Sequence, residues 1–336
     1  MTCTPPLILA GDLGGTNFRV AVFRGDPEMT KVHSAKFHST DHGSVEEMVH
    51  LFLSGITLEA PLLAASFGVP GPNVHGVVKA SNLGWEINIK ALPEKLGIPH
   101  VSVLNDLEAT AYGLSALGEN DFAVLQSGSG FCMGNQCVIA PGTGLGEAGL
   151  FWDGTRHTPW ACEGGHADFA PTDELQHELL KYLRAEYGSV SFERVVSGMG
   201  IKNIYRFLRD TGRGVESAEV AREMLTDDAA AVIDRHAADS SCDLCRATMD
   251  LFVQTLGAEC SNMALKTMAI GGVFLGGGIP PKIIELLRRP LFLDNFLEKG
   301  RLRPLLETLP VKVVLNDETA LLGAAKNALR ILEKTV

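Results

Sequence analysis

The sequence predicts an α/β protein of about two domains, and three observations lead to this class. The chain has 336 residues, which corresponds to roughly two domains of about 150 residues each. Hydrophobic residues make up 46% of it and charged residues 21%, a composition with which a chain can bury a sizeable core. Short apolar runs alternate with helical patterns along the whole length, which is typical of α/β layers.

In the first half, we expect strands at 7–10, 18–23, 31–37, 62–69 and 101–104. The first two are apolar runs on either side of a glycine-rich turn, which predicts a hairpin. Ser44, with Glu47 three residues later, forms a capping box that predicts a helix through Leu53. The fifth strand is followed directly by Asn105-Asp106 and a helix that we expect to reach about Leu117.

The second half repeats this pattern. Strands expected at 136–140 and 146–151 flank another glycine-rich turn, and long helices are expected at 173–187 and 242–268. A strand at 272–275 ends in three glycines, and a strand at 311–315 is followed by Asn316-Asp317 and a helix over 319–334. Residues 210–219 are expected to form an exposed loop. The repeated strand-Asn-Asp-helix order favours two diverged copies of one unit facing a shared cleft, although Asn and Asp are also ordinary helix N-caps.

Charge and cysteine content exclude several classes of partner. Lysine and arginine number 29 against 40 aspartates and glutamates, so the net charge is −11, and no basic run occurs. We therefore expect no nucleic acid and no membrane among the partners. Seven cysteines are scattered through the chain, which favours free thiols in a reducing compartment over a disulfide framework. The first seven residues carry no basic signal region, and a cytoplasmic protein is expected.

Three glycine-rich segments could hold a nucleotide. Glycines let backbone amides approach a phosphate, and Asp12 in the first segment is consistent with a bound cation such as Mg²⁺. A flat adenine or ribose could lie against the third segment. The alternative in each case is a tight turn, in which Asp12 bonds to its own backbone. No P-loop sequence occurs. The segments are Gly11-Asp12-Leu13-Gly14-Gly15-Thr16-Asn17, Gly142-Thr143-Gly144 and Gly276-Gly277-Gly278.

Other candidates are polar side chains suited to hydroxyl-rich ligands. Asp106 follows a buried strand and could accept a proton from a substrate hydroxyl, or could serve only at a helix N-terminus with Asn105. Glu163 and His166 flank two glycines, and Glu193 lies further on; each could bind a hydroxyl or simply face solvent. Zinc is not expected, because Cys162, His166 and Asp168 lack a fourth ligand and Cys242 and Cys245 form a single pair.

In this order, the motifs resemble the bacterial-type glucokinases of the sugar kinase and actin-like ATPase superfamily. The resemblance covers essentially the whole chain and implies a two-domain actin-like ATPase fold, which is ribonuclease H-like, with an interdomain cleft. It implies a small α/β domain of residues 1–116 plus 318–336 and a large α/β domain of residues 117–317 with added helices. Besides the three glycine-rich segments, it is carried by Leu104-Asn105-Asp106, residues 163–171, residues 193–198 and Leu315-Asn316-Asp317.

The resemblance also implies an activity and its residues. It implies ATP-dependent phosphorylation of D-glucose at the 6-hydroxyl, giving glucose 6-phosphate and ADP, as the entry step of glycolysis in a homodimer. Asp106 would be the general base, and Asp12 would lie near Mg²⁺. Glucose would be bound by Asn105, Asp106, Glu163, His166 and Glu193; ATP would be bound by Gly11, Asp12, Gly14, Gly15, Thr16, Gly142, Thr143, Gly144, Gly276, Gly277 and Gly278.

Some segments differ from the family pattern. Pro171-Thr172-Asp173-Glu174 stands where the related repressor–ORF–kinase branch has a cysteine-rich zinc loop, so no zinc is expected. Residues 66–72 and 81–85 look closer to that branch; the first is expected to line the sheet near the cleft, and Asn82 could reach the sugar or cap a turn. A kinase for mannose or fructose, an enzyme using polyphosphate or ADP, and a non-catalytic sugar sensor are the alternatives.

Overall fold

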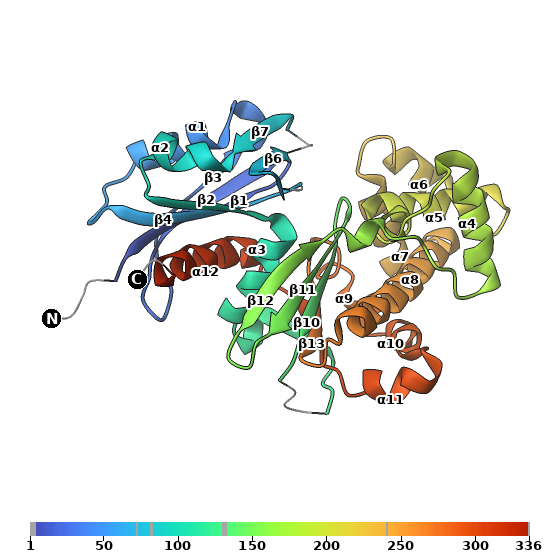
Figure 1. The fold of residues 1–336 in the computed structure, drawn as a ribbon. Helices are drawn as coiled ribbons and strands as arrows, with labels where there is room; N and C mark the ends of the chain where they lie inside the picture. Colours follow the sequence, from blue (N-terminus) through green and yellow to red (C-terminus); the bar gives the residue numbers. More distant parts are fainter. Residues whose placement is uncertain (1–4, 72, 81–82, 130–132, 240, 335–336) are drawn as a thin grey trace. The chain divides into compact units, whose positions relative to one another are not determined.

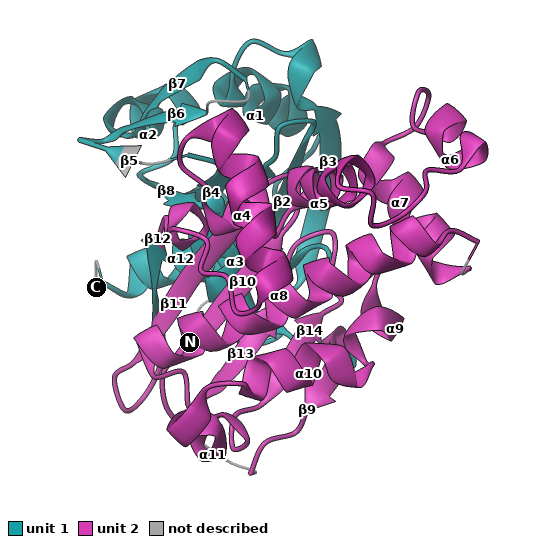
Figure 2. Ribbon diagram, turned by 90° about the vertical axis from the view of Figure 1, so that its right-hand side faces the viewer, with its two compact units in different colours: residues 1–120, 158–161, 316–336 teal, residues 121–157, 162–315 magenta. Residues whose placement is uncertain are grey.

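The computed structural model describes residues 5–71, 73–80, 83–129, 133–239 and 241–334 (Figure 1). The chain divides into two compact units (Figure 2). Unit 1 comprises residues 1–120, 158–161 and 316–336, and unit 2 comprises residues 121–157 and 162–315.

Unit 1 is built on a five-stranded sheet with the order β3-β2-β1-β4-β8. Its first three strands pair antiparallel, whereas β4 and β8 extend the sheet in parallel from β1. The strands are β1 (Leu7–Leu13), β2 (Asn17–Arg24), β3 (Lys31–His38), β4 (Leu62–Val69) and β8 (His100–Asn105).

The two faces of this sheet bury alternate residues of the same strands, because side chains of a strand point to opposite sides in turn. Leu7 and Leu9 of β1 pack in a core with helix α1 (Val45–Ser54). Ile8 and Ala10 pack instead in a core with helix α12 (Thr319–Glu333), which lies along the opposite face in Figure 1. The last helix of the chain is therefore part of the core of the first sheet.

Helix α12 also crosses α3 (Asp106–Gly113) at very short range. A Cβ atom at Gly323 would collide with the carbonyl oxygen of Ala109, and one at Gly113 would collide with that of Thr319. Both positions need glycine because the two backbones touch. A cluster of three polar side chains, two of them buried and the third, Ser102, half-buried, fixes the far part of α12: Asn327 donates from Nδ2 to Ser66 Oγ at 3.0 Å and to Ser102 Oγ at 2.7 Å.

A second, three-stranded sheet completes unit 1, and the sequence analysis did not predict it. It has the order β5-β6-β7, with β5 (Asn73–Val74), β6 (Val77–Ala80) and β7 (Trp85–Asn88). Val78 and Ile87 face each other across β6 and β7, and both are buried in the α1 core. The short helix α2 (Leu92–Leu96) follows and contributes Leu92 to the same core.

Unit 2 contains the second large sheet, with the order β12-β11-β10-β13-β14-β9. The pairing β10–β11 is antiparallel, and β10–β13 and β13–β14 are parallel, as in β1–β2, β1–β4 and β4–β8 of unit 1. This repeated topology supports the predicted duplication. The strands are β9 (Phe122–Gln126), β10 (Gln136–Pro141), β11 (Leu145–Trp152), β12 (His157–Cys162), β13 (Gly272–Leu275) and β14 (Val311–Val314).

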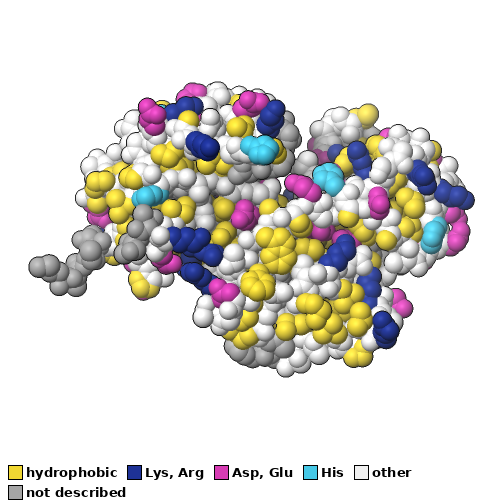
Figure 3. All heavy atoms as spheres, viewed as in Figure 1, with side chains coloured by type: hydrophobic (Ala, Val, Ile, Leu, Met, Phe, Trp, Pro, Cys, Tyr) yellow, Lys and Arg dark blue, Asp and Glu magenta, His cyan; other side chains and the backbone are white. Residues whose placement is uncertain are grey.

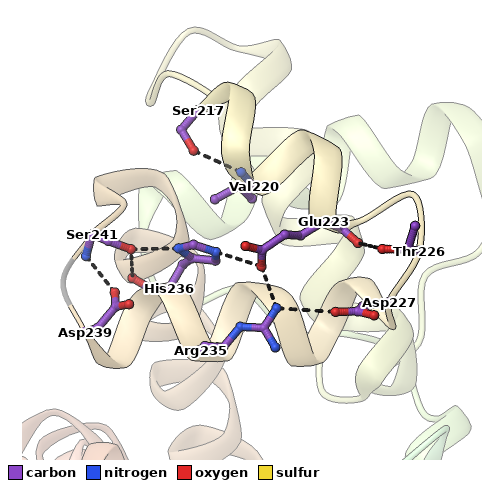
Figure 4. Close-up of polar contacts among 9 residues, drawn as sticks. All are labelled: Ser217, Val220, Glu223, Thr226, Asp227, Arg235, His236, Asp239 and Ser241. Carbon is purple, nitrogen blue, oxygen red and sulfur yellow. Dashed lines mark hydrogen bonds and ion pairs between the residues drawn. The ribbon is translucent and has the colours of Figure 1, made fainter.

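The helices of unit 2 pack around the 25-residue helix α8, whose buried side chains join the main core of the unit. Figure 4 shows how His236 joins its neighbours: Nδ1 lies 2.7 Å from Ser241 Oγ, and Nε2 lies 3.0 Å from Glu223 Oε2. The helices are α4 (Glu174–Tyr187), α5 (Gly198–Asp210), α6 (Ala218–Glu223), α7 (Ala229–Ala238), α8 (Asp243–Thr267), α9 (Ile284–Leu287), α10 (Pro290–Leu297) and α11 (Arg303–Leu306).

Most predicted elements are confirmed within one or two residues, including the strands 62–69 and 272–275 and the cap at Ser44. Two expectations need correction. The α3 helix ends at Gly113 and continues only as a 3-10 turn over Leu114–Ala116. The loop at 210–219 ends early, because Ser217 caps α6 by accepting from Val220 N. Within the segment 66–72, Ser66 is fully buried against Asn327, while Gly68 lies beside Asp106.

The described surface carries both signs of charge. On the face shown in Figure 3, lysine and arginine side chains are interspersed with acidic ones. Many of the cations are paired, for example Arg24 with Glu59 and Arg213 with Glu178. Within the described part of the chain, no helix has both the length and the apolar character needed to cross a bilayer.

Candidate active site

The first glycine-rich turn connects β1 to β2 in unit 1. It is shorter than predicted, because β1 continues to Leu13 and the turn proper is 14–16. Gly14 N donates to Asn17 O at 2.8 Å, and Ser39 Oγ donates to Gly14 O at 3.0 Å, which fixes the turn from the end of β3. Gly11 lies inside the strand, where a Cβ atom would come within 2.5 Å of the Phe67 ring. Packing therefore explains that glycine.

Asp12 stands at the end of β1 in an acidic environment. Burial raises the pKa of its carboxyl to about 6; nearby Arg19 lowers it, while Asp106 and Asp317 raise it further. Arg19 also pairs with Asp317, with 2.5 Å between Nη2 and Oδ2. Asp106 and Asp317 thus raise the cost of ionising Asp12 against the single guanidinium of Arg19, so an added cation would be stabilising beside Asp12.

The two Asn-Asp pairs have the same local structure. Asn105 Oδ1 accepts from Leu107 N at 2.9 Å at the start of α3, and Asn316 Oδ1 accepts from Glu318 N at 2.9 Å. Asp106 is the first residue of α3 and also receives the Leu107 amide on Oδ1, at 2.9 Å. The expectation that Asn105 caps a helix is confirmed. The cap also holds Asp106 at the carboxyl end of a parallel strand, where open α/β sheets place ligands.

Asp317 was not among the predicted site residues. The sequence carried a signal for it, because the strand-Asn-Asp echo placed it in the position that corresponds to Asp106. Its influence on Asp12 arises only through the fold, which returns the chain to unit 1 after residue 315.

The second glycine-rich turn belongs to unit 2 and joins β10 to β11. Gly142 N donates to Gly144 O at 2.8 Å, and Gly198 N at the start of α5 donates to Gly142 O at 2.8 Å. Glu193 Oε2 accepts a hydrogen bond from Leu145 N at 3.0 Å. A Cβ atom at Gly144 would collide with the same oxygen. Glu193 therefore supports this turn and does not merely face solvent.

The Glu163–His166 turn lies beside Glu193. His166 N donates to Glu163 O at 3.0 Å, which closes a 3-10 turn over Gly164–His166. The imidazole Nδ1 of His166 is 4.0 Å from Glu193 Oε1, and the side chains of Glu163 and His166 are exposed. The structure thus brings three of the predicted sugar-binding side chains together in unit 2.

The third glycine segment follows β13 and reaches the second turn. Gly277 has φ of +79°, and a Cβ atom there would lie 2.5 Å from Pro141 O, so only glycine fits. Gly276 N donates to Ile139 O at 2.9 Å. Of the three glycines, Gly278 lines the adjoining pocket, while Gly276 and Gly277 attach the segment to β10.

This pocket has a volume of about 620 Å³, within the range of small-molecule sites. Gly142, Thr143 and the start of α5 contribute to its lining, together with apolar side chains such as Ile201, Met249 and Ile283. Its charged residues include two pairs. Lys202 Nζ lies 3.0 Å from Asp228 Oδ1, and burial raises the pKa of Asp234 while Lys282 lowers it.

The predicted residues thus fall into two groups, each within its own unit. Asp12, Asn105 and Asp106 belong to unit 1; Glu163, His166, Glu193 and the second and third glycine segments belong to unit 2. Asn82 lies outside the described residues. The described residues contain no group of three or more His, Cys, Asp or Glu side chains placed to hold a metal ion directly.

Two large sheets of one topology, each with a glycine-rich hairpin turn, define the class of this protein as an actin-like ATPase of the sugar-kinase type. The chain belongs to the Glucokinase family, whose sequence model matches residues 9–331. It is 38% identical over 340 residues to a protein named Glucokinase from Trichormus variabilis, covering 97% of this chain and 99% of that relative.

Solved structures agree with this assignment. A glucokinase from an Antarctic psychrotroph is similar with a TM-score of 0.84 and 31% identity, covering 96% of this chain and 99% of that one. A ROK-family glucokinase from Streptomyces griseus, in complex with glucose and AMPPNP, has a TM-score of 0.65 at 20% identity, with 96% and 99% covered, and supports the fold. The family and fold class expected from the sequence are confirmed.

Proposed function

We propose that this chain is an ATP-dependent glucokinase that transfers the γ-phosphoryl group of ATP to the 6-hydroxyl of D-glucose, giving glucose 6-phosphate and ADP. The observation that carries the mechanism is the placement of Asp106, which a helix cap holds at the end of β8, with its charge acting on Asp12. Asp106 accepts the proton of the 6-hydroxyl as the oxygen attacks phosphorus. A general base of this kind contributes typically about 10²–10⁴-fold.

The nucleotide is assigned to the glycine-rich turns and the pocket of unit 2. Adenosine occupies the pocket, where apolar walls suit a flat base and Gly278 permits close approach. The triphosphate extends along Gly142 and Thr143, and the first turn contributes Gly14, Gly15 and Thr16. Phosphoryl transfer passes through a loose transition state, so these groups act mainly by positioning and by stabilising charge.

Mg²⁺ is assigned to Asp12. The acidic surroundings of Asp12 suit a divalent cation, and Mg²⁺ usually keeps several waters and binds through one or two carboxylates plus substrate phosphates. That mode needs no cluster of three protein ligands. When bound, the ion would neutralise charge on the β- and γ-phosphates, and Asp12 would hold it through one of its waters.

Glucose is assigned to Asn105 and Asp106 of unit 1 and to Glu163, His166 and Glu193 of unit 2. Carboxylates accept hydrogen bonds from hydroxyl groups, and the Asn amide and the His ring can donate them. The contact of His166 with Glu193 supports the assignment, because one hydroxyl-rich ligand could bond both side chains. Glucose is neutral, so the acidic character of the chain does not oppose its binding.

The test is Mg²⁺-dependent release of ADP from ATP by the purified chain, with and without glucose. The proposal expects release that requires both glucose and Mg²⁺. Mannose, fructose, ADP and polyphosphate at matched concentrations measure which sugar and donor are preferred. Release that ignores glucose would contradict the proposal in favour of another acceptor, and glucose binding without any release would favour a sugar sensor.

Several further assignments belong to this proposal. The protein acts in the cytoplasm at the entry to glycolysis, which is consistent with the free thiols of Cys137, Cys162, Cys242, Cys245 and Cys260. It forms a homodimer, which a light-scattering mass near that of one 36.0 kDa chain would contradict. Its two folding domains are residues 1–116 plus 318–336 and residues 117–317.

A further inference from the structure

Two glutamates with buried carboxyl groups lie against each other beneath the Glu163–His166 turn. Glu147 is on β11 and is 1% exposed; Glu259 is in the middle of α8 and is 0% exposed. In the ladder, Glu147 lies opposite Ile139 of β10, which belongs to the core that packs on α8. Their carboxyl groups lie within hydrogen-bonding reach of each other.

The hydrogen bonding of this pair is incomplete unless it carries a proton. Glu147 Oε1, Glu147 Oε2 and Glu259 Oε1 are buried and have no hydrogen-bond donor among the described residues. Two ionised carboxylates would present only acceptors to each other. A protonated Glu147 donates to Glu259, and one proton thereby joins an oxygen of each carboxyl group in a hydrogen bond.

The surroundings decide which glutamate carries the proton. Glu259 Oε2 accepts from Asn262 Nδ2 at 2.9 Å, and Lys266 Nζ lies 3.9 Å from Glu259 Oε1, so the negative charge is better placed on Glu259. Burial raises the pKa of both carboxyl groups above the ordinary value, and the charge of Glu259 raises that of Glu147 further. Lys299 also lowers the pKa of Glu259, and burial together with the charges of the two glutamates raises the pKa of the nearby thiols of Cys137 on β10, Cys162 on β12 and Cys260 on α8.

The pair directly supports the turn above it. A Cβ atom at Gly164 would collide with Glu147 Oε2, and a Cβ atom at Gly165 would collide with the carbonyl oxygen of Leu145. Cys162 Sγ, just before the turn, donates to Glu147 O at 3.4 Å. The backbone between Glu163 and His166 therefore rests on β11, with the Glu147 carboxyl as its contact surface.

We propose that Glu147 and Glu259 share one proton and that this carboxyl pair is a positioning element, which holds the Glu163–His166 turn in place for the sugar. The inference rests on the proposed function, which assigns Glu163 and His166 to glucose. Neither glutamate of the pair touches the substrate. Loss of the shared proton at high pH places two negative charges together beneath Gly164, and their separation moves the turn that rests on them.

The test measures the Kd of glucose by calorimetry between about pH 6 and about pH 9, without nucleotide or Mg²⁺, so that sugar binding is measured separately from phosphoryl transfer. For the wild-type protein, we expect the Kd to rise about threefold or more toward high pH. In Glu147→Gln, an amide donor replaces the proton, and the Kd should stay within about 1.5-fold over the same range. The KM for ATP should stay within about twofold in this variant.

Asp243→Asn is the matched control, because it removes an exposed acid from the same helix. Its pH profile should follow that of the wild type. If Glu147→Gln does not fold, as judged by circular dichroism, Glu259→Gln replaces it with the same expected flattening. A wild-type Kd without pH dependence, or a rise of the Kd with pH that persists in the glutamine variant, would overturn the proposal that the two glutamates share a proton and position the turn. A wild-type chain that binds no glucose at any pH would instead refute the proposed function.

Discussion

At the scale of single residues, the proposed chemistry depends on carboxyl groups whose charge the fold controls. Asp106 is held by the α3 cap, and Glu193 accepts a hydrogen bond from the Leu145 amide. Burial and the charges of Asp106 and Asp317 raise the pKa of Asp12. Asp106 and Glu193 are oriented by backbone amides, whereas the ionisation of Asp12 is governed by burial and by the charges around it. Substitution of one of these residues should therefore change ligand binding and the rate of phosphoryl transfer to different extents.

Asp106→Asn tests the general base. The amide preserves size and the Leu107 contact but cannot accept the proton of the 6-hydroxyl. We expect kcat to fall about 10²–10⁴-fold, with the Kd of glucose changed by less than about tenfold. Stopped-flow or coupled assays of ADP release, together with calorimetric glucose binding, measure both. Normal turnover in a correctly folded variant would remove Asp106 from this role.

Asp12→Asn tests the acidic environment of the first turn. Because the folded-state pKa of Asp12 is raised to about 6 from 3.8, its contribution to stability is full at low pH and is lost as the pH rises through about 6. The asparagine variant should thus be more stable than the wild type near pH 8 in EDTA, by about 1–3 kcal/mol, and nearly equal near pH 4. Urea unfolding measures this.

The same variant should lose activity while it gains stability. It lacks the charge assigned to Mg²⁺, so kcat/KM for ATP should fall at least about tenfold, and added Mg²⁺ with nucleotide should raise the melting temperature of the wild type only. An Asp12→Asn protein that is less stable than the wild type at pH 8 would show that burial and the repulsion from Asp106 and Asp317 do not outweigh the attraction of Arg19 for the ionised carboxylate.

At the scale of elements, the link between α12 and the first sheet rests on a polar cluster within an apolar core. Asn327 donates to Ser66 of β4 and Ser102 of β8, whose hydroxyls also lie 3.1 Å apart. Because all three side chains come from different elements, the cluster fixes the position of α12 along the sheet. The close α3–α12 contact at Gly113 and Gly323 leaves little freedom for another position.

Asn327→Ala should lower the free energy of unfolding by about 1–3 kcal/mol, because it leaves buried hydroxyls with fewer partners. Adding Ser66→Ala and Ser102→Ala should recover part of that loss, since no unpaired group then remains. Chemical denaturation of the single and triple variants makes the comparison. Additive losses in the triple variant would show that the three side chains do not act as one cluster.

Elements that the sequence predicted have local signals, and those it missed depend on distant partners. The run 62–69 and the Ser44 cap stand out within their own segments. In contrast, β9 exists through its antiparallel pairing with β14, almost 190 residues later, and β12 contains Pro159 and little apolar alternation. The short strands β5, β6 and β7 have two to four residues each, too few for a periodic pattern.

The residues of the candidate site also divide into those with a local sequence signal and those that depend on distant partners. Motifs that are contiguous in sequence, such as Asn105-Asp106 and the Glu163–His166 turn, could be proposed in advance. The influence of Asp317 on Asp12, the bond from Leu145 N to Glu193 and the contact of Glu147 with Glu259 each join residues tens to hundreds of positions apart. A single sequence gives no signal for such pairs, because only the packed sheets and helices bring them together.

At the scale of the whole molecule, the chain leaves unit 1 after residue 120, returns to it briefly at residues 158–161 and rejoins it at residue 316. Deleting residues 319–336 should therefore destabilise the beginning of the chain, because Leu321, Ala324, Ala325 and Ala328 cover Ile8, Ala10, Ala21 and Phe23. We expect the shortened protein to lose cooperative unfolding and to bind a hydrophobic dye. Removing only residues 335–336 is the control and should preserve the wild-type melting temperature.

The position of α12 also has a consequence for biosynthesis. A ribosome releases the strands of the first sheet before unit 2, but the helix that covers one face of this sheet is translated only after unit 2. Unit 2 lies entirely within residues 121–315, so it can mature while strands β1 and β2 still expose Ile8 and Phe23. Unit 1 is thus begun before unit 2 and completed after it, and its bare strands are the surface that a ribosome-associated chaperone would shield during translation.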